Sequence, residues 1–244
     1  MELKVEYISN IVGEEIQDEY GRSMGFLVSI TGDIDGFVKQ VEIKVADRSV
    51  ERIPVERLRV KDGKLMIVPE WKYEAIKVIE SLDRAYRRRK AVESVLSQGD
   101  IPGEVIETMK RRLTEEIKRL RVRAEEVKSI IRARINEIDD ETLRLSSAIA
   151  NLQVLYFSGE VGEKGYTHGM NQLRKLKNIL EEEKSDAKKV LDRLEKILEI
   201  ARAPEKYMKT ARHAKEEKHA KREVEAKPPA RVPSDDSIVV KIEE

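Results

Sequence analysis

The chain has 244 residues, of which 39% are charged and 5% are aromatic. This composition is typical of coiled coils and far from that of an average globular domain. Because 48 Lys and Arg residues nearly balance 47 Asp and Glu residues, any attraction to nucleic acid or to a membrane must be local. The chain contains no cysteine, which excludes a disulfide framework, a cysteine zinc site and a thiol catalyst.

Residues 1–69 differ from the rest, since short β-prone runs alternate there with turn signals. Several short strands in so few residues favour a small closed or half-closed barrel. Glycine-containing turns are expected at residues 32–36 and 61–63. The expected strands are Val5–Ile8, Glu14–Asp18, Gly25–Thr31, Phe37–Val45 and Leu65–Val68.

Two stretches of this region resemble a PRC-barrel domain. The first, residues 11–26, is punctuated by Gly13, Gly21 and Gly25, and the second, Ile53–Leu58, resembles the closing strand and turn of that family. The resemblance implies an adaptor or assembly module, and some members of the family belong to ribosome-maturation proteins.

A helical coiled-coil rod is predicted for residues 70–203, with helices at about 70–98, 103–157 and 170–203. In the longest helix, apolar residues recur every three or four positions from Ile106 to Tyr156, which places them on one face. So thin a stripe must lie against other helices. We expect residues 70–98 to pack antiparallel on 104–131, and residues 170–202 on 124–157.

A rod that is two helices thick leaves apolar surface exposed, so the pattern favours self-association into dimers or filaments. The third helix loses its apolar pattern near Glu183 and Lys184, where we expect the weakest packing. The seam residues expected to carry oligomerisation are Leu113, Ile117, Leu120, Val127, Ile131, Ile138, Leu145, Ile149 and Leu152.

Residues 204–233 are rich in Lys, Glu and Ala and end in a proline-rich stretch, which predicts a charged helix or a disordered linker. Residues 234–244 follow, with a β-prone run between acidic residues. Such a tethered run predicts a peptide that adds a strand to the sheet of a partner. The alternatives are that it adds a strand to the chain's own barrel or that it frays. The expected partner-binding residues are Val232, Pro233, Ile238, Val239, Val240, Lys241 and Ile242.

Basic residues are concentrated between Arg84 and Arg134, where fifteen Lys or Arg stand against eight Asp or Glu, a net charge of +7. If the chain reverses at residues 99–103, the basic residues of both helices share one surface. This surface suits anionic lipid or, without base specificity, nucleic-acid phosphates. A solvated face neutralised by nearby glutamates, or a basic half that staggers against the acidic half of other copies, are the alternatives. The patch comprises Arg84, Arg87, Arg88, Arg89, Lys90, Lys110, Arg111, Arg112, Lys118 and Arg119.

The whole plan resembles the archaeal CdvA family of cell-division proteins, in which a PRC-like barrel, a long coiled coil and a tethered C-terminal peptide follow one another. The resemblance implies a cytoplasmic, filament-forming scaffold at the division site, on the inner face of the cell membrane. It also implies that the tail recruits an ESCRT-III homologue, CdvB. The alternative function is a nucleic-acid-binding protein, either chromosome-associated or assisting ribosome assembly, which uses the basic patch and the barrel.

No catalytic site, cofactor or metal is expected, and we expect no enzyme. His213 and His219 fall on different sides of a helix, which suits no common metal site, and no nucleophile–base pair is recognisable. No apolar run is long enough to span a bilayer. The sequence thus predicts an α+β chain: a small N-terminal PRC-like β-barrel, a long antiparallel helical coiled-coil rod and a flexible C-terminal tail.

Overall fold

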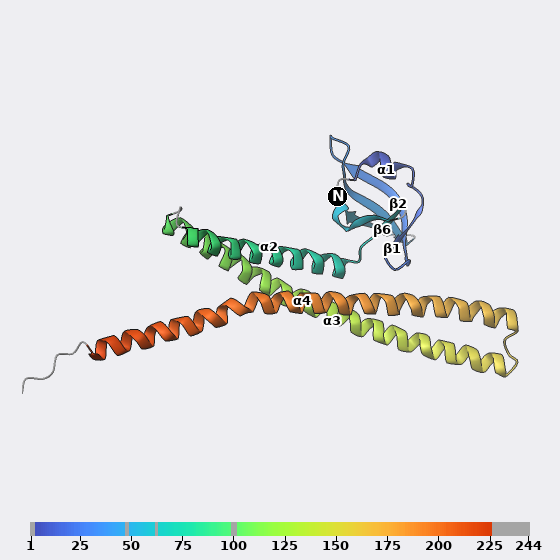
Figure 1. The fold of residues 1–244 in the computed structure, drawn as a ribbon. Coiled ribbons are helices and arrows are strands. Elements are labelled where there is room, and N and C mark those ends of the chain that lie inside the picture. The colour runs from blue at the N-terminus through green and yellow to red at the C-terminus, as the bar shows by residue number, and fades with distance from the viewer. Residues whose placement is uncertain (1–2, 47–48, 62, 99–101, 226–244) are drawn as a thin grey trace, which may run out of the picture. The chain divides into compact units, whose positions relative to one another are not determined.

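The computed structural model describes residues 3–46, 49–61, 63–98 and 102–225. The chain divides into two compact units, residues 1–201 and residues 202–244. In the first unit a six-stranded sheet precedes the long helices along the chain (Figure 1). This order confirms the predicted α+β class.

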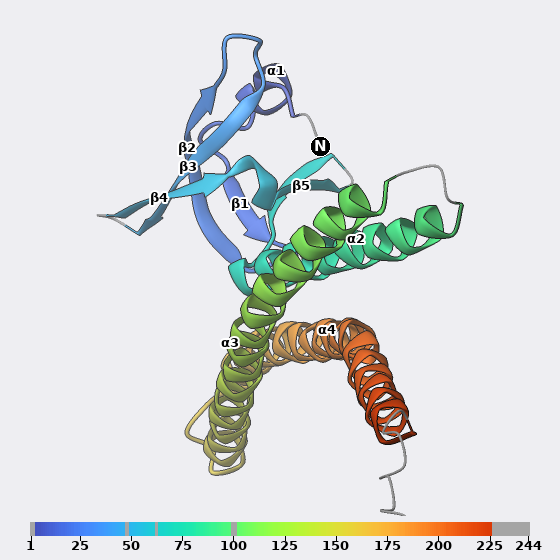
Figure 2. The ribbon, with the colours of Figure 1, turned by 90° about the vertical axis from the view of Figure 1, so that its left-hand side faces the viewer.

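One mixed sheet contains all six strands, in the spatial order β4-β3-β2-β1-β6-β5 (Figure 2). β1 and β6 are parallel, and the other neighbouring pairs are antiparallel. Within the described residues the edge strands β4 and β5 do not pair with each other, so the predicted barrel is an open sheet. The strands are β1 (Glu15–Asp18), β2 (Ser23–Gly32), β3 (Val38–Ala46), β4 (Ser49–Pro54), β5 (Leu58–Lys61) and β6 (Lys64–Ile67).

The three glycines of the PRC-like pattern, Gly13, Gly21 and Gly25, have φ angles of 95°, 81° and 124°. Residues with a side chain rarely adopt this conformation. At Gly25 the space is also closed, because an added Cβ would lie 2.1 Å from the carbonyl oxygen of Lys44. The absence of a side chain therefore permits β2 to approach β3 closely, with Phe26 aligned to Lys44.

The expected first strand is wrong, since Val5–Ser9 forms a short helix, α1. This segment buries one large side chain: Ile8 is 2% exposed, whereas Tyr7 is 74% exposed. A single helical turn is enough to direct one side chain into a core. Strands β4 and β5 were not among the expected strands, because each buries one large side chain, Ile53 and Leu58 respectively, and their other residues are exposed.

Three long helices follow: α2 (Glu70–Gln98), α3 (Gly103–Phe157) and α4 (Glu163–Glu225). α4 begins at Glu163 and not at Met170, because the residues from Ser158 to Gly162, with Gly159 at a φ of +80°, suffice to reverse the chain. α4 also continues through Pro204, where a separate segment was expected. Proline does not always end a helix, and strong helix formers follow it.

The helices of the first unit pack antiparallel in chain order. Arg123 of α3 donates a 2.9 Å hydrogen bond to Glu74 of α2, and Ala85 packs against Ile117. Between α3 and α4, Tyr156 stacks on Tyr166 with ring centres 4.2 Å apart. Further along the same pair, Lys128 and Arg132 of α3 both contact Glu195 of α4.

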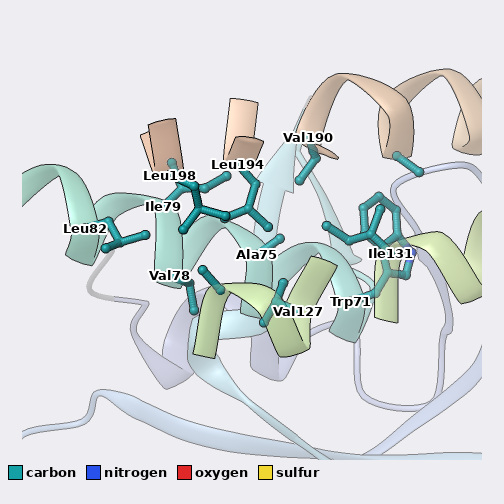
Figure 3. Close-up of a cluster of buried hydrophobic side chains, with 12 residues drawn as sticks. Trp71, Ala75, Val78, Ile79, Leu82, Val127, Ile131, Val190, Leu194 and Leu198 are labelled. Atoms are coloured by element: carbon teal, nitrogen blue, oxygen red, sulfur yellow. The ribbon is translucent and has the colours of Figure 1, made fainter. Parts of the chain in front are cut away.

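α2, α3 and α4 share one apolar core, shown in Figure 3. The predicted rod of two helices is therefore three helices thick in this region. Ala75, Ala124 and Ala187, one from each helix, are each 0% exposed, and such small side chains let helix axes come close together. The buried residues of this helical core are Trp71, Ala75, Val78, Ile79, Leu82, Ala124, Val127, Ile131, Ala187, Val190, Leu194 and Leu198.

Candidate functional site: a polar junction and two exposed surfaces

Glu183 occupies a core position of α4, three residues after Leu180 and four before Ala187, and it is 1% exposed. Four donors reach its carboxylate. Nε and Nη2 of Arg134 each donate a 3.0 Å hydrogen bond, and the indole Nε1 of Trp71 donates one of 3.1 Å. Nη1 of Arg22 lies 2.7 Å away. The expectation of weak packing at Glu183 is therefore wrong, because the gap in the apolar seam is filled by a fully partnered charge.

The electrostatics of Glu183 follow from these partners. Burial by itself raises the pKa of a carboxyl group, but the hydrogen bond from Arg134 and the charge of Arg22 hold the pKa of Glu183 below its usual range. The pKa of Arg134 is raised in turn, chiefly by its hydrogen bond to Glu183. A buried charge is stable only when it is paired and hydrogen-bonded in this way.

Asp186 lies one helical turn further along α4 and holds a second set of contacts. It accepts a 2.7 Å hydrogen bond from the hydroxyl group of Tyr20 and forms a 2.7 Å ion pair with Lys72. Lys72 also reaches Glu19 at 2.6 Å. Burial and the hydrogen bond to Asp186 raise the pKa of Tyr20 above its ordinary value, and the phenol is the donor in this contact.

Asp18, at the end of β1, shapes the turn that brings Tyr20 and Arg22 to the helices. Its Oδ1 accepts 2.9 Å hydrogen bonds from the backbone N–H groups of Tyr20 and Arg22. Its Oδ2 accepts a 2.7 Å bond from Nε of Arg22. The β1–β2 turn, α2, α3 and α4 thus meet at one polar junction, which consists of Asp18, Glu19, Tyr20, Arg22, Trp71, Lys72, Arg134, Glu183 and Asp186.

This junction was not predicted from the sequence. Its one usable signal was a carboxylate at a seam position of α4, since a buried charge demands a partner. Two of its partners, Arg134 and Trp71, lie 49 and 112 residues away along the chain, so spacing alone does not reveal them.

The expected oligomerisation seam divides into two groups. Ile117, Val127, Ile131 and Ile138 are between 0% and 4% exposed; the first three lie in the cores shared with α2 and α4. The chain's own helices cover Ile117, Val127 and Ile131, and oligomerisation through the seam stays a prediction. The other five are half-buried: Leu113, Leu120, Leu145, Ile149 and Leu152.

The basic patch lies on α2 and α3 near their connection. The contact of Ala85 with Ile117 brings residues 84–90 alongside residues 110–119. Among the patch residues, Arg84, Arg87 and Lys118 form ion pairs with carboxylates of their own helix, and Arg89 lies over the ring of Tyr86. Within the described part of the chain, Arg88, Arg111, Arg112 and Arg119 are exposed and have no ion pair.

The expected partner-binding residues of the tail, from Val232 to Ile242, lie outside the described residues. Within the described ranges, no group of three or more His, Cys, Asp or Glu residues is arranged to hold a metal ion. None of the helices there is long and apolar enough to cross a bilayer.

Fold and junction define a helical coiled-coil protein with a small β-sheet domain before its helices. The family model of the CdvA-like coiled-coil domain matches residues 70–220, and the chain belongs to this family. Cell division protein A of Sulfolobus acidocaldarius is 29% identical to it over 195 residues, which cover 80% of this chain and 82% of that protein. No solved structure matches the chain. The resemblance found in the sequence is thereby confirmed, and the similarity supports a role in cell division.

Proposed function

We propose that this protein is a non-enzymatic scaffold of cell division, which assembles through its helices and recruits a partner through its C-terminal segment. The observation that carries the proposal is the family match over residues 70–220, together with the length shared with a cell-division protein. The junction around Glu183 supports it, because it fixes a β-sheet domain on a helical core and so suits a scaffold that holds its parts in place.

Recruitment is assigned to residues 234–244, and the partner is an ESCRT-III homologue of the CdvB type. The motif Ile238-Val239-Val240-Lys241-Ile242 has the alternation that strand addition uses, since every second side chain points to the same face. The test is the affinity of the full-length protein for the partner, measured by calorimetry, with and without residues 234–244. Unchanged affinity after the deletion refutes this role of the tail.

A matched pair of variants separates strand addition from unspecific stickiness. Replacing Ile238, Val240 and Ile242 by Ser removes one face of the strand, and replacing Val239 and Lys241 by Ser removes the other. Strand addition into a pocketed sheet edge predicts that the two variants lose unequal affinity, because only one face fills pockets. Equal losses point instead to unstructured hydrophobic contact.

Assembly into filaments is the second part of the proposal. Leu145, Ile149 and Leu152 of the seam are half-buried, and α4 lies beside this part of α3, so apolar surface remains next to them among the described residues. Electron microscopy of the purified protein with and without anionic liposomes tests this part. Filaments support the scaffold at the inner face of the membrane, and an absence of polymers under all conditions contradicts it.

A nucleic-acid-binding function is the second candidate, and one observation favours it. Arg88, Arg111, Arg112 and Arg119 carry exposed charges that no carboxylate of the described chain neutralises. Titration of DNA and RNA across salt concentrations tests it, because each phosphate contact adds about one unit to the salt slope. Charge reversal of Arg88 and Arg112 is expected to flatten that slope. Reversal of Arg132, which is already paired with Glu195, is the control, and liposome flotation separates lipid from nucleic acid.

A further inference from the structure

A second row of uncharged residues runs along α3, separate from the seam that faces α4. Its members are alternately four and three residues apart, which places them on one side of the helix. All five are exposed, and the three large apolar members are 71%, 66% and 81% exposed. We call this row the outer stripe; it consists of Leu143, Ser147, Ala150, Val154 and Phe157.

Four of the five residues of the outer stripe, from Ser147 to Phe157, lie in a region without charge. Residues 145–159 contain no Asp, Glu, Lys or Arg, and neither do residues 165–173 at the start of α4, although 39% of the chain is charged. The stacking of Tyr156 on Tyr166 holds these two segments side by side. Depletion of charge together with aromatic residues and methionine marks the core of protein interfaces, and Tyr156, Phe157, Tyr166 and Met170 lie here.

The middle of α3, around residues 124–131, gives the contrast. There α2 and α4 both cover the helix, and Ala124, Val127 and Ile131 are 0% exposed. Around the outer stripe α4 is the only helix of the chain, among the described residues, that packs against α3. In the α3–α4 pair, the apolar residues of α3 that face α4 are covered, whereas those of the outer stripe are left without a helix against them.

We infer that the outer stripe is the place where a second copy of this chain packs its own outer stripe. An uncharged surface is complementary to itself, because pairing two copies buries no charge. Ser147 and Ala150, in the middle of the stripe, let two helices approach closely. The charge-poor end of the α3–α4 hairpin offers roughly 30 Å by 20 Å, or about 600 Å² per copy. This area is near the low end for specific interfaces and fits a reversible contact within an assembly.

This inference deepens the proposed scaffold function and rests on it, but it does not depend on the tail. The test is the mass of the full-length protein by light scattering across concentrations, for Val154→Glu and for Val122→Glu. Val154 and Val122 are matched, since both lie on α3 and they are 66% and 64% exposed. We expect Val154→Glu to weaken dimerisation by about tenfold or more, because two carboxylates then face each other in the interface, and Val122→Glu to leave it unchanged.

Cross-linking gives a second measurement, since the chain has no cysteine of its own. Ala150 is the middle residue of the outer stripe, so it faces its counterpart whether the two helices run parallel or antiparallel. Under mild oxidation Ala150→Cys is expected to form disulfide-linked dimers, and Asn151→Cys, which is exposed but off the stripe, is expected to form far fewer.

Three outcomes overturn the inference: a wild-type protein that stays monomeric, equal dimerisation of both Glu variants, or equal cross-linking of both Cys variants. If the wild-type protein is a monomer and Val154→Glu loses its binding to vesicles, the outer stripe is assigned to a lipid surface instead. Binding of the ESCRT-III homologue by Val154→Glu is measured in parallel. If Val154→Glu still binds the ESCRT-III homologue and still dimerises, only the inference about the outer stripe fails. If the homologue still binds after deletion of residues 234–244, the recruitment proposal fails.

Discussion

Arg134 and Glu183 form a bidentate pair between α3 and α4, with Nε donating to Oε1 and Nη2 donating to Oε2, each at 3.0 Å. The planar guanidinium matches the carboxylate in this geometry, which makes such pairs stronger and more specific than single contacts. Arg22 from the sheet domain and Trp71 from α2 contact the same carboxylate. Glu183 of α4 therefore contacts residues of the β1–β2 turn, α2 and α3.

Replacing Glu183 by Gln is expected to lower the free energy of unfolding by about 3 kcal/mol, because Arg22 and Arg134 lose their shared counter-charge. Guanidinium unfolding monitored by circular dichroism measures the loss. Asp192→Asn is the control on the same helix, since its pair with Lys196 is exposed and is expected to matter little. Equal behaviour of the two variants contradicts the account of the junction.

Acid is expected to weaken the junction. The pKa values of Glu183 and Asp186 lie below their usual range in the folded protein, despite burial, because of Arg134 and Lys72 respectively. The folded state thus binds fewer protons than the unfolded state. The stabilisation is complete above about pH 5 and is lost as the pH falls through the folded pKa values. Melting temperatures from pH 7 to pH 3 should show the gap between wild type and Glu183→Gln narrowing in acid; a constant gap argues against this.

Gly25→Ala is expected to damage the sheet more than Gly36→Ala does. Both residues have positive φ angles, of 124° and 81°, and this conformation costs a side-chain residue about 1–2 kcal/mol. Only at Gly25 does the new Cβ also meet backbone, at 2.1 Å from the oxygen of Lys44, so β2 must move away from β3. Hydrogen exchange of the β2 and β3 amides measures the damage, and similar protection in both variants contradicts the argument.

Leu194→Ala tests the apolar core that the three helices share. Leu194 is 0% exposed and lies among residues of α2 and α3, so the variant is expected to lose about 2–5 kcal/mol of unfolding free energy. Leu176→Ala is the matched control, because Leu176 lies on the same helix and is 47% exposed. Its loss is expected to stay under about 1 kcal/mol. If both variants lose little, α4 does not pack on α2 and α3 as described.

Local patterns predicted a large part of this fold. The apolar repeat of α3 and the glycine-rich breaks before and after it indicated long antiparallel helices, because helix periodicity and chain reversal are local properties. The positive φ angles of Gly13, Gly21 and Gly25 explain why these glycines punctuate the PRC-like pattern. Helix α1 and strands β4 and β5 escaped prediction, since each buries one large side chain and so shows no apolar period.

The junction was not predictable in the same way. Glu183 broke the apolar pattern of α4, and a broken pattern on its own suggests a weak contact. The compensating charges of Arg22 and Arg134 lie in the β1–β2 turn and on α3, and only the tertiary packing brings them together. The third helix of the shared core was not predicted for a similar reason. α2 and α4 come together at small alanine residues, which do not stand out in a pattern of large apolar residues.

A double-mutant cycle between Arg134 and Glu183 tests the central claim most directly. Arg134→Met, Glu183→Gln and the double variant are unfolded in guanidinium beside the wild type. The claim that this charged break in the seam locks α4 to the rest of the unit predicts a coupling energy of about 1–3 kcal/mol, so that the double variant loses less than the two single losses added together. Losses that add within about 0.3 kcal/mol contradict it.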